Sequence, residues 1–187
     1  IEDCQIQNNT TSSNLVYLHE GKANRCSVKG NTTSDRIMTM YYASSSISNS
    51  LICDNNCTKA YNEPVYNDRG NILNCTFVNN NSKCNKFMNM QNATLKNSIL
   101  VGNQTNANYS GAFNLGGTNT IKNNMLEATF INGNIDGSMT YAAFTDAENG
   151  DYSLSANSYC INAGADVADS LDLLGKARKQ GGAVDMG

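Results

Sequence analysis

The sequence predicts an all-β fold: a right-handed parallel β-helix (a solenoid) of about six coils with a C-terminal capping segment. A phrase of the form apolar–x–Asn–small–x–apolar–x–x–Asn occurs six times, at intervals of 22, 24, 25, 23 and 26 residues. A period of this size is typical of chains that stack one coil per repeat. No stretch among the repeats keeps the 3.6-residue period of a helix, and the chain is rich in Asn, which tolerates tight corners. The copies begin at Ile1, Ala23, Ile47, Ile72, Leu95 and Ile121.

Within each phrase, the first, fourth and sixth residues are expected to face inward. The fourth and sixth alternate as in a strand. The third is Asn in four of the six copies and is expected to form a left-handed corner between two strands. The fourth is Cys or Ser in five copies, because a tight corner leaves little room. A further Asn column is expected at the next corner, where stacked side chains can hydrogen-bond along the axis: Asn9, Asn31, Asn55, Asn80 and Asn103.

An earlier strand is expected in each coil, with two or three short strands per coil. The predicted segments are Leu15–Leu18, Thr39–Tyr42, Pro64–Asn67, Phe87–Met90 and Phe113–Gly116. Counting back from each phrase places Tyr17, Tyr41, Tyr66 and then Asn89 in one column. The neighbouring column, which is expected to face inward, contains Val16, Met40, Val65 and Met88.

The tyrosines of this column are therefore predicted to face outward as a flat aromatic ladder that binds carbohydrate. Sugar rings present apolar C–H faces that stack on aromatic rings, and nearby polar side chains bind the hydroxyls. The assigned residues are Tyr17, Tyr41, Tyr66 and Asn89. Two alternatives stay open: a register shifted by one would bury the tyrosines in the core, or the ladder would contact another protein.

Charge and hydropathy exclude several classes of partner. The net charge is −3 and the pI is about 5.0, with scattered Lys and Arg, so no nucleic acid is expected to bind. No apolar run is long enough for a transmembrane segment. Ile1 already lies in the repeat frame, so upstream coils or a partner are expected at this edge.

The seven cysteines leave at least one outside any internal disulfide. Cys4, Cys26 and Cys75 belong to the small inward column and are expected to be buried thiols. A disulfide between Cys57 and Cys84, or between Cys4 and Cys26, is the alternative. With one His and no zinc-type spacing, neither a metal nor a cofactor is expected. The alternative is Ca²⁺ bound by Asp146, Glu148 and Asp151.

The repeat lapses after about residue 130, which divides one domain into coils (1–130) and a cap (131–187). A solenoid needs a terminal segment over its last coil. The residues expected to seal the core are Phe144, Tyr152, Leu154 and Ile161, and those expected to hold the turns are Asp151, Asp172, Arg178 and Asp185.

The tail contains Gly150-Asp151-Tyr152-Ser153-Leu154, then Ser158-Tyr159-Cys160-Ile161-Asn162-Ala163-Gly164, Asp172-Leu173-Leu174-Gly175, Arg178 and Val184-Asp185-Met186-Gly187. This order resembles the C-terminal region of bacterial, Bacteroidetes-type, pectin-lyase-like surface proteins of the choice-of-anchor Q type. That family has Pro where this chain has Tyr159, and it continues beyond the position of Gly187. The resemblance implies an extracellular or cell-surface location associated with the outer membrane.

Enzymatic residues are not assigned. Glu20, Glu63 and Asp68 are expected on one side of the solenoid with Arg69 and His19, an arrangement that a solvated charged face also explains. We therefore expect a non-catalytic module that interacts with polysaccharide or with a surface protein. One alternative is a polysaccharide lyase or glycoside hydrolase whose catalytic residues lie partly upstream; another is a structural subunit of a surface assembly.

Overall fold

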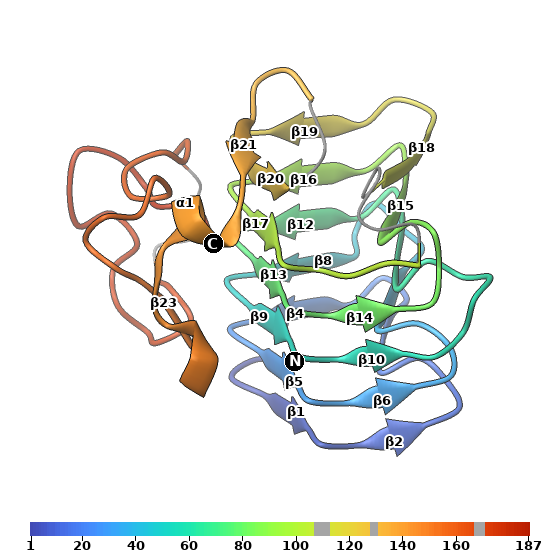
Figure 1. Cartoon of the computed structure of the whole chain (residues 1–187). Coiled ribbons are helices and arrows are strands. Elements are labelled where there is room, and N and C mark those ends of the chain that lie inside the picture. The colour runs from blue at the N-terminus through green and yellow to red at the C-terminus, as the bar shows by residue number, and fades with distance from the viewer. Residues whose placement is uncertain (107–112, 128–130, 167–170) are drawn as a thin grey trace.

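A computed structural model describes residues 1–106, 113–127, 131–166 and 171–187 and shows the predicted parallel β-solenoid (Figure 1). The strands stack in four parallel sheets of seven, five, five and four strands, so the chain makes about five turns, close to the expected number. A typical turn contributes four strands rather than two or three, because a two-residue strand forms at an additional corner.

The seven-stranded sheet contains β1 (Gln5–Gln7), β5 (Ser27–Lys29), β9 (Leu51–Cys53), β13 (Thr76–Val78), β17 (Ile99–Val101), β20 (Met125–Glu127) and β21 (Ile135–Gly137). The four-stranded sheet contains β2 (Thr10–Thr11), β6 (Thr32–Thr33), β10 (Asn56–Cys57) and β14 (Asn81–Ser82). The β3 sheet contains β3 (Val16–Leu18), β7 (Met38–Met40), β11 (Val65–Asp68), β15 (Met88–Gln91) and β18 (Phe113–Gly116). The β4 sheet contains β4 (Lys22–Asn24), β8 (Ser46–Ser48), β12 (Asn71–Leu73), β16 (Thr94–Lys96) and β19 (Thr120–Lys122).

The core lies inside the coils, as the phrase predicts. First-position residues pair in register along the β4 sheet, and sixth-position residues pair along the seven-stranded sheet. Both columns join one hydrophobic cluster. The first-position members buried there are Ala23, Ile47, Ile72, Leu95 and Ile121, and the sixth-position members are Val28, Ile52, Phe77, Leu100 and Leu126.

The third position forms the predicted corner in all six copies. Its φ angles lie between +51° and +56° for Asp3, Arg25, Asn49, Asn74, Asn97 and Asn123. Asn and Asp enter this left-handed region at lower cost than most residues, which explains their preference here. Arg25 adopts the same angle and makes an ion pair with Asp3 of the coil before, with Nε 2.7 Å from Oδ1.

The second Asn column forms a ladder beside the next corner. In each step, the backbone N–H and the side-chain Nδ2 of one Asn donate to Oδ1 of the Asn in the following coil. The same Nδ2 atoms donate to backbone carbonyls of the preceding coil, such as that of Ile52, which accepts from Asn80 at 2.9 Å. The left-handed residue comes directly before the ladder Asn: Asn8, Gly30, Asp54, Asn79 and Gly102. The ladder satisfies polar groups that the corners would otherwise bury unpaired.

The tail after β21 packs along the side of the solenoid (left in Figure 1). It contains α1 (Met139–Ala142), β22 (Phe144–Asp146), the 3₁₀ helix η1 (Ala147–Asn149) and β23 (Asp151–Leu154), and β22 and β23 form an antiparallel hairpin. Phe144, Tyr152 and Leu154 were expected to seal the core over the last coil, but they lie in a second apolar cluster outside the coils, against the outer face of the seven-stranded sheet. Ile161 is half-buried and belongs to neither cluster.

Candidate functional site

The β3 sheet carries the predicted tyrosine column in a partly different register. Tyr17 pairs with Thr39, Thr39 with Tyr66, and Tyr66 with Asn89, so Thr39 occupies the place expected for Tyr41. Met38, rather than Met40, likewise pairs with Val16 and Val65, although Met40 is also buried. The register differs because five residues separate β7 from β8, whereas three separate β3 from β4.

Tyr41 nevertheless lies between the two other tyrosines. Its ring centroid is 5.8 Å from that of Tyr17 and 5.4 Å from that of Tyr66. Thr39 is buried, and its hydroxyl donates to Asn14 Oδ1 at 2.8 Å. Tyr41 follows directly after the strand, and its ring lies next to those of Tyr17 and Tyr66. The rings are tilted by 53° and 51° to their neighbours, so the ladder is not flat as predicted. Tyr17 is 52% exposed and the other two are half-buried, so the rings lie outside the core.

Cationic and aromatic side chains extend this surface, which we call the tyrosine cluster (Tyr17, His19, Arg36, Tyr41, Tyr42, Tyr66 and Arg69). The Arg36 guanidinium lies 4.7 Å from the Tyr66 ring centroid, and that of Arg69 lies 5.4 Å from the Tyr42 centroid, as in cation–π contacts. His19 contacts the edge of Tyr42, with 4.5 Å between ring centroids. Arg36 Nε is buried without a hydrogen-bond partner in the described part of the chain, and the guanidinium lies over the Tyr66 ring.

The other predicted residues on this side have local partners. Asn89 lies in the Tyr66 register, but it is buried and its Oδ1 accepts from Gln91. Asp68 forms a salt bridge with Arg69 at 3.1 Å. Glu63 accepts a hydrogen bond from Asn114 at 3.0 Å. Asn89 is therefore mostly withdrawn from the surface, and two of the acids are engaged in pairs.

The outer face of the seven-stranded sheet is the second notable surface. On β1 and β5 it presents Gln5, Gln7, Ser27 and Lys29. From β9 onward the same two columns become largely apolar, and the tail covers them. The covered residues are Leu51, Cys53, Val78, Ile99, Val101 and Met125. This change along the fifth and seventh positions of the phrase is the sequence signal that predicts where the tail packs.

Arg178 fixes the tail to the corner of the coils. Its Nε donates to Asn49 Oδ1 at 2.6 Å, and its Nη2 donates to the Asn74 carbonyl at 3.1 Å and the Gly187 carbonyl at 2.6 Å. The third-position asparagines are themselves linked, since Asn74 Nδ2 donates to Asn49 Oδ1 and Asn97 Nδ2 to Asn74 Oδ1, both at 3.1 Å. The structural role predicted for Arg178 is thus visible as a set of hydrogen bonds between tail and solenoid.

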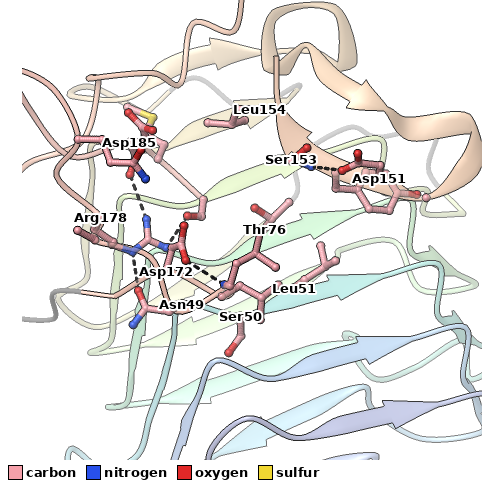
Figure 2. A pocket seen from close by; sticks show the side chains of 18 residues that line it. Asn49, Ser50, Leu51, Thr76, Asp151, Ser153, Leu154, Asp172, Arg178 and Asp185 are labelled. Carbon is pink, nitrogen blue, oxygen red and sulfur yellow. Dashed lines mark hydrogen bonds between the residues drawn. The ribbon is translucent and has the colours of Figure 1, made fainter. Parts of the chain in front are cut away.

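A cavity of about 370 Å³ opens between two arms of the tail, which are the hairpin strand β23 and the segment that contains Asp172 and Arg178. Figure 2 shows Asp151, Ser153 and Leu154 on one side, Asp172 and Arg178 on the other, and Ser50, Leu51 and Thr76 on the solenoid between them. We call this cavity the arm pocket. Its residues come from parts of the chain more than 100 positions apart, which explains why repeat spacing did not reveal it.

A polar recess adjoins the hairpin on its other side. The Tyr152 hydroxyl donates to Asp54 Oδ1 at 2.8 Å and accepts from Asn79 Nδ2 at 3.0 Å. Burial, and then the hydrogen bond to Asp54, raise the pKa of Tyr152. Because this hydroxyl stays protonated and is already paired, it acts as a structural contact between tail and coils.

Two of the three acids named for Ca²⁺ have local roles: Asp146 caps η1 through Asn149, and Asp151 accepts from the backbone of Ser153. Across the described ranges, no three His, Cys, Asp or Glu side chains gather closely enough to hold a metal ion. All seven cysteines are free thiols, so neither of the alternative disulfides is present, and Cys26 and Cys75 are buried as expected while Cys4 is partly buried. Burial raises the pKa of Cys53, Cys75 and Cys160 to about 12, which makes these thiols unreactive.

Comparison with protein-family models, with curated proteins and with solved structures found no match. Among the described helices, none has the length and apolar character needed to cross a bilayer. Fold and surfaces together define a parallel β-solenoid with an outward aromatic cluster and a side-packed tail.

Proposed function

We propose that this chain is a non-catalytic module of a secreted or cell-surface protein that binds polysaccharide through the tyrosine cluster. The observation that carries the proposal is the alignment of three outward tyrosine rings from successive coils, with centroids 5.8 and 5.4 Å apart. A row of rings along the solenoid axis matches a linear chain of sugar units better than a single small ligand. The resemblance of the tail to pectin-lyase-like surface proteins supports the same location and ligand class.

The ring faces are not equally accessible, so the rings have different roles. Arg36 covers one face of Tyr66, and Tyr41 has a tyrosine on both sides. Tyr17 lies at the end of the row, with the His19 ring nearly parallel to it at 6.4 Å between centroids, and it is the most exposed of the three at 52%. We therefore assign the main stacking contact to Tyr17, with Tyr41 and Tyr66 supporting its orientation and extending the apolar strip. Arg69 and Asp68 lie beside the strip and can bond sugar hydroxyls.

The test is binding of the whole chain to a panel of neutral and acidic glycans, with Tyr17→Ala and Tyr66→Ala as variants. A stacked ring contributes about 1 kcal/mol or more, so Tyr17→Ala is expected to weaken binding about fivefold or more. Tyr61→Ala is the matched control, because Tyr61 is 88% exposed and lies outside the cluster. Equal loss in Tyr61→Ala and Tyr17→Ala, or no loss in either, removes the cluster from glycan binding.

A structural role in a surface assembly is the second candidate, with the tyrosine cluster as a contact surface for another protein. Exposed Tyr rings beside Arg side chains, such as Arg36 over Tyr66, are the residue types that dominate protein interfaces. Co-purification of a partner protein together with absence of glycan affinity would favour assembly, and release of unsaturated oligosaccharides, seen as ultraviolet absorbance, would favour a lyase.

A further inference from the structure

The arm pocket is a partly open cavity whose lining has a defined chemistry. Its volume of about 370 Å³ lies within the range of small-molecule sites. The floor is the outer face of the solenoid at Ser50, Leu51 and Thr76, and the two walls are β23 and the segment around Asp172 (Figure 2). A ligand seated there would touch three separate parts of the fold.

Apolar side chains form much of its lining. Leu51 and Leu154 already pack in the outer apolar cluster, and Met186 is buried there. Leu173 and Leu174 complete the apolar lining, and Leu174 is 70% exposed. An exposed leucine beside an apolar recess gains contacts when a ligand with an apolar body covers it.

The charged lining favours a positive ligand. Three acids, Asp151, Asp172 and Asp185, line the pocket, against one base, Arg178. Arg178 is 7% exposed and its guanidinium is directed into hydrogen bonds with the coils and the C-terminal segment. Asp172 Oδ1 accepts from the backbone of Leu174 and Lys176, which fixes the carboxylate at the wall. Asp151 is held on the opposite wall by Ser153.

We propose that the arm pocket binds a small organic cation: an ammonium or amidinium group carried on an apolar body about the size of one aromatic ring. The apolar body would lie against Leu51, Leu154 and Leu174, and the cation would be attracted by the carboxylates of Asp151 and Asp172, which line opposite walls. This site is independent of the tyrosine cluster, which lies on the β3 sheet.

The test is titration of the whole chain, followed by protein NMR shifts, with three probes of similar shape: 2-phenylethylammonium, 2-phenylethanol and 3-phenylpropanoate. The cation is expected to bind at least about tenfold more tightly than the alcohol or the anion, because three acids and one base line the pocket. Added salt is expected to weaken the cation only. Equal affinities, tighter binding of the anion, or no saturable binding of the cation at roughly 10 mM would overturn the proposal.

Substitutions of residues that line the arm pocket test whether the cation binds there. Asp151→Asn and Asp172→Asn are each expected to weaken the cation about five- to tenfold while leaving the alcohol unchanged. Asp136→Asn is the matched control, because this exposed acid on β21 does not line the pocket. Leu174→Ser alters an exposed side chain without removing a turn contact and is expected to weaken all three probes severalfold. Unchanged cation affinity in all three pocket variants would place binding elsewhere and refute the site.

Discussion

The outer face of the seven-stranded sheet differs between its first two strands and the strands that follow. On β1 and β5 it is polar, and the third-position corner residues are Asp3 and Arg25, joined by an exposed ion pair. From β9 onward it is largely apolar under the tail, and the corner residues Asn49, Asn74 and Asn97 are buried. The backbone is the same in both regions, since all these corners are left-handed. Backbone geometry therefore sets which positions turn, while coverage by the tail sets which side chains stand there.

Replacing Arg178 by Met is expected to have the largest effect on this contrast. The change removes a buried guanidinium and leaves the Asn49 and Asn74 oxygens without its hydrogen bonds, at a cost of roughly 3 kcal/mol or more. Urea unfolding, followed by circular dichroism, measures the loss in the free energy of unfolding.

The matched change is Arg25→Met on the uncovered coils. Arg25 pairs with Asp3 and Glu2 at the surface, where water and salt screen the interaction, so little change in stability is expected. If Arg178→Met and Arg25→Met lowered the free energy of unfolding by similar amounts, the hydrogen bonds of Arg178 would contribute no more than an exposed ion pair.

Substitutions in the inner Asn ladder are expected to show no contrast between the regions. Asn31→Ala and Asn80→Ala each remove side-chain bonds to a neighbouring ladder Asn and to a backbone carbonyl. Each is expected to cost about 2–3 kcal/mol, since buried partners lose their bonds. A much smaller loss at Asn31 than at Asn80 in the same unfolding assay would mean that the tail stabilises the interior as well as the outer face.

Truncating side chains at the seventh position of the phrase is expected to give a smaller difference in stability between the two regions. Val101→Ala removes two methyl groups from a fully buried side chain in the tail cluster and is expected to cost about 1–2 kcal/mol. Gln7→Ala alters the exposed residue of the same column on β1 and is expected to change stability by at most about 0.5 kcal/mol. Thermal unfolding of both variants compares them directly; equal shifts would contradict the assigned cover.

The sequence predicted the coils well because each coil repeats the same local problem. Asn at the third position and apolar residues at the first and sixth follow from corner sterics and burial, which depend on neighbours a fixed step away. The predicted register of Tyr41 was wrong because the connection from β7 to β8 has two more residues than that from β3 to β4. Counting back a fixed number of residues from each phrase cannot detect such an insertion. The arm pocket depends on contacts between Asn49 and Arg178, which no local spacing encodes. The polar-to-apolar change between Gln7 and Val78 was nevertheless present in the sequence.

Acid pH provides the smallest test, because the two groups concerned are at the surface. Hydrogen bonds from the side chain and backbone of Ser153 lower the pKa of Asp151, and a hydrogen bond from Arg25 lowers the pKa of Asp3. A carboxyl whose folded-state pKa lies below its unfolded value of about 3.9 stabilises the fold above that value, and this contribution is lost as pH falls through the folded pKa. Amide hydrogen exchange below about pH 4 is therefore expected to rise in the β22–β23 hairpin and in the first two coils. Asp151→Asn should remove this pH dependence from the hairpin alone, and Asp3→Asn from the first coils alone. If either variant removed the pH dependence of exchange from both regions, the tail and the uncovered coils would unfold as one unit. The two regions would then differ in amino-acid composition but not in local stability.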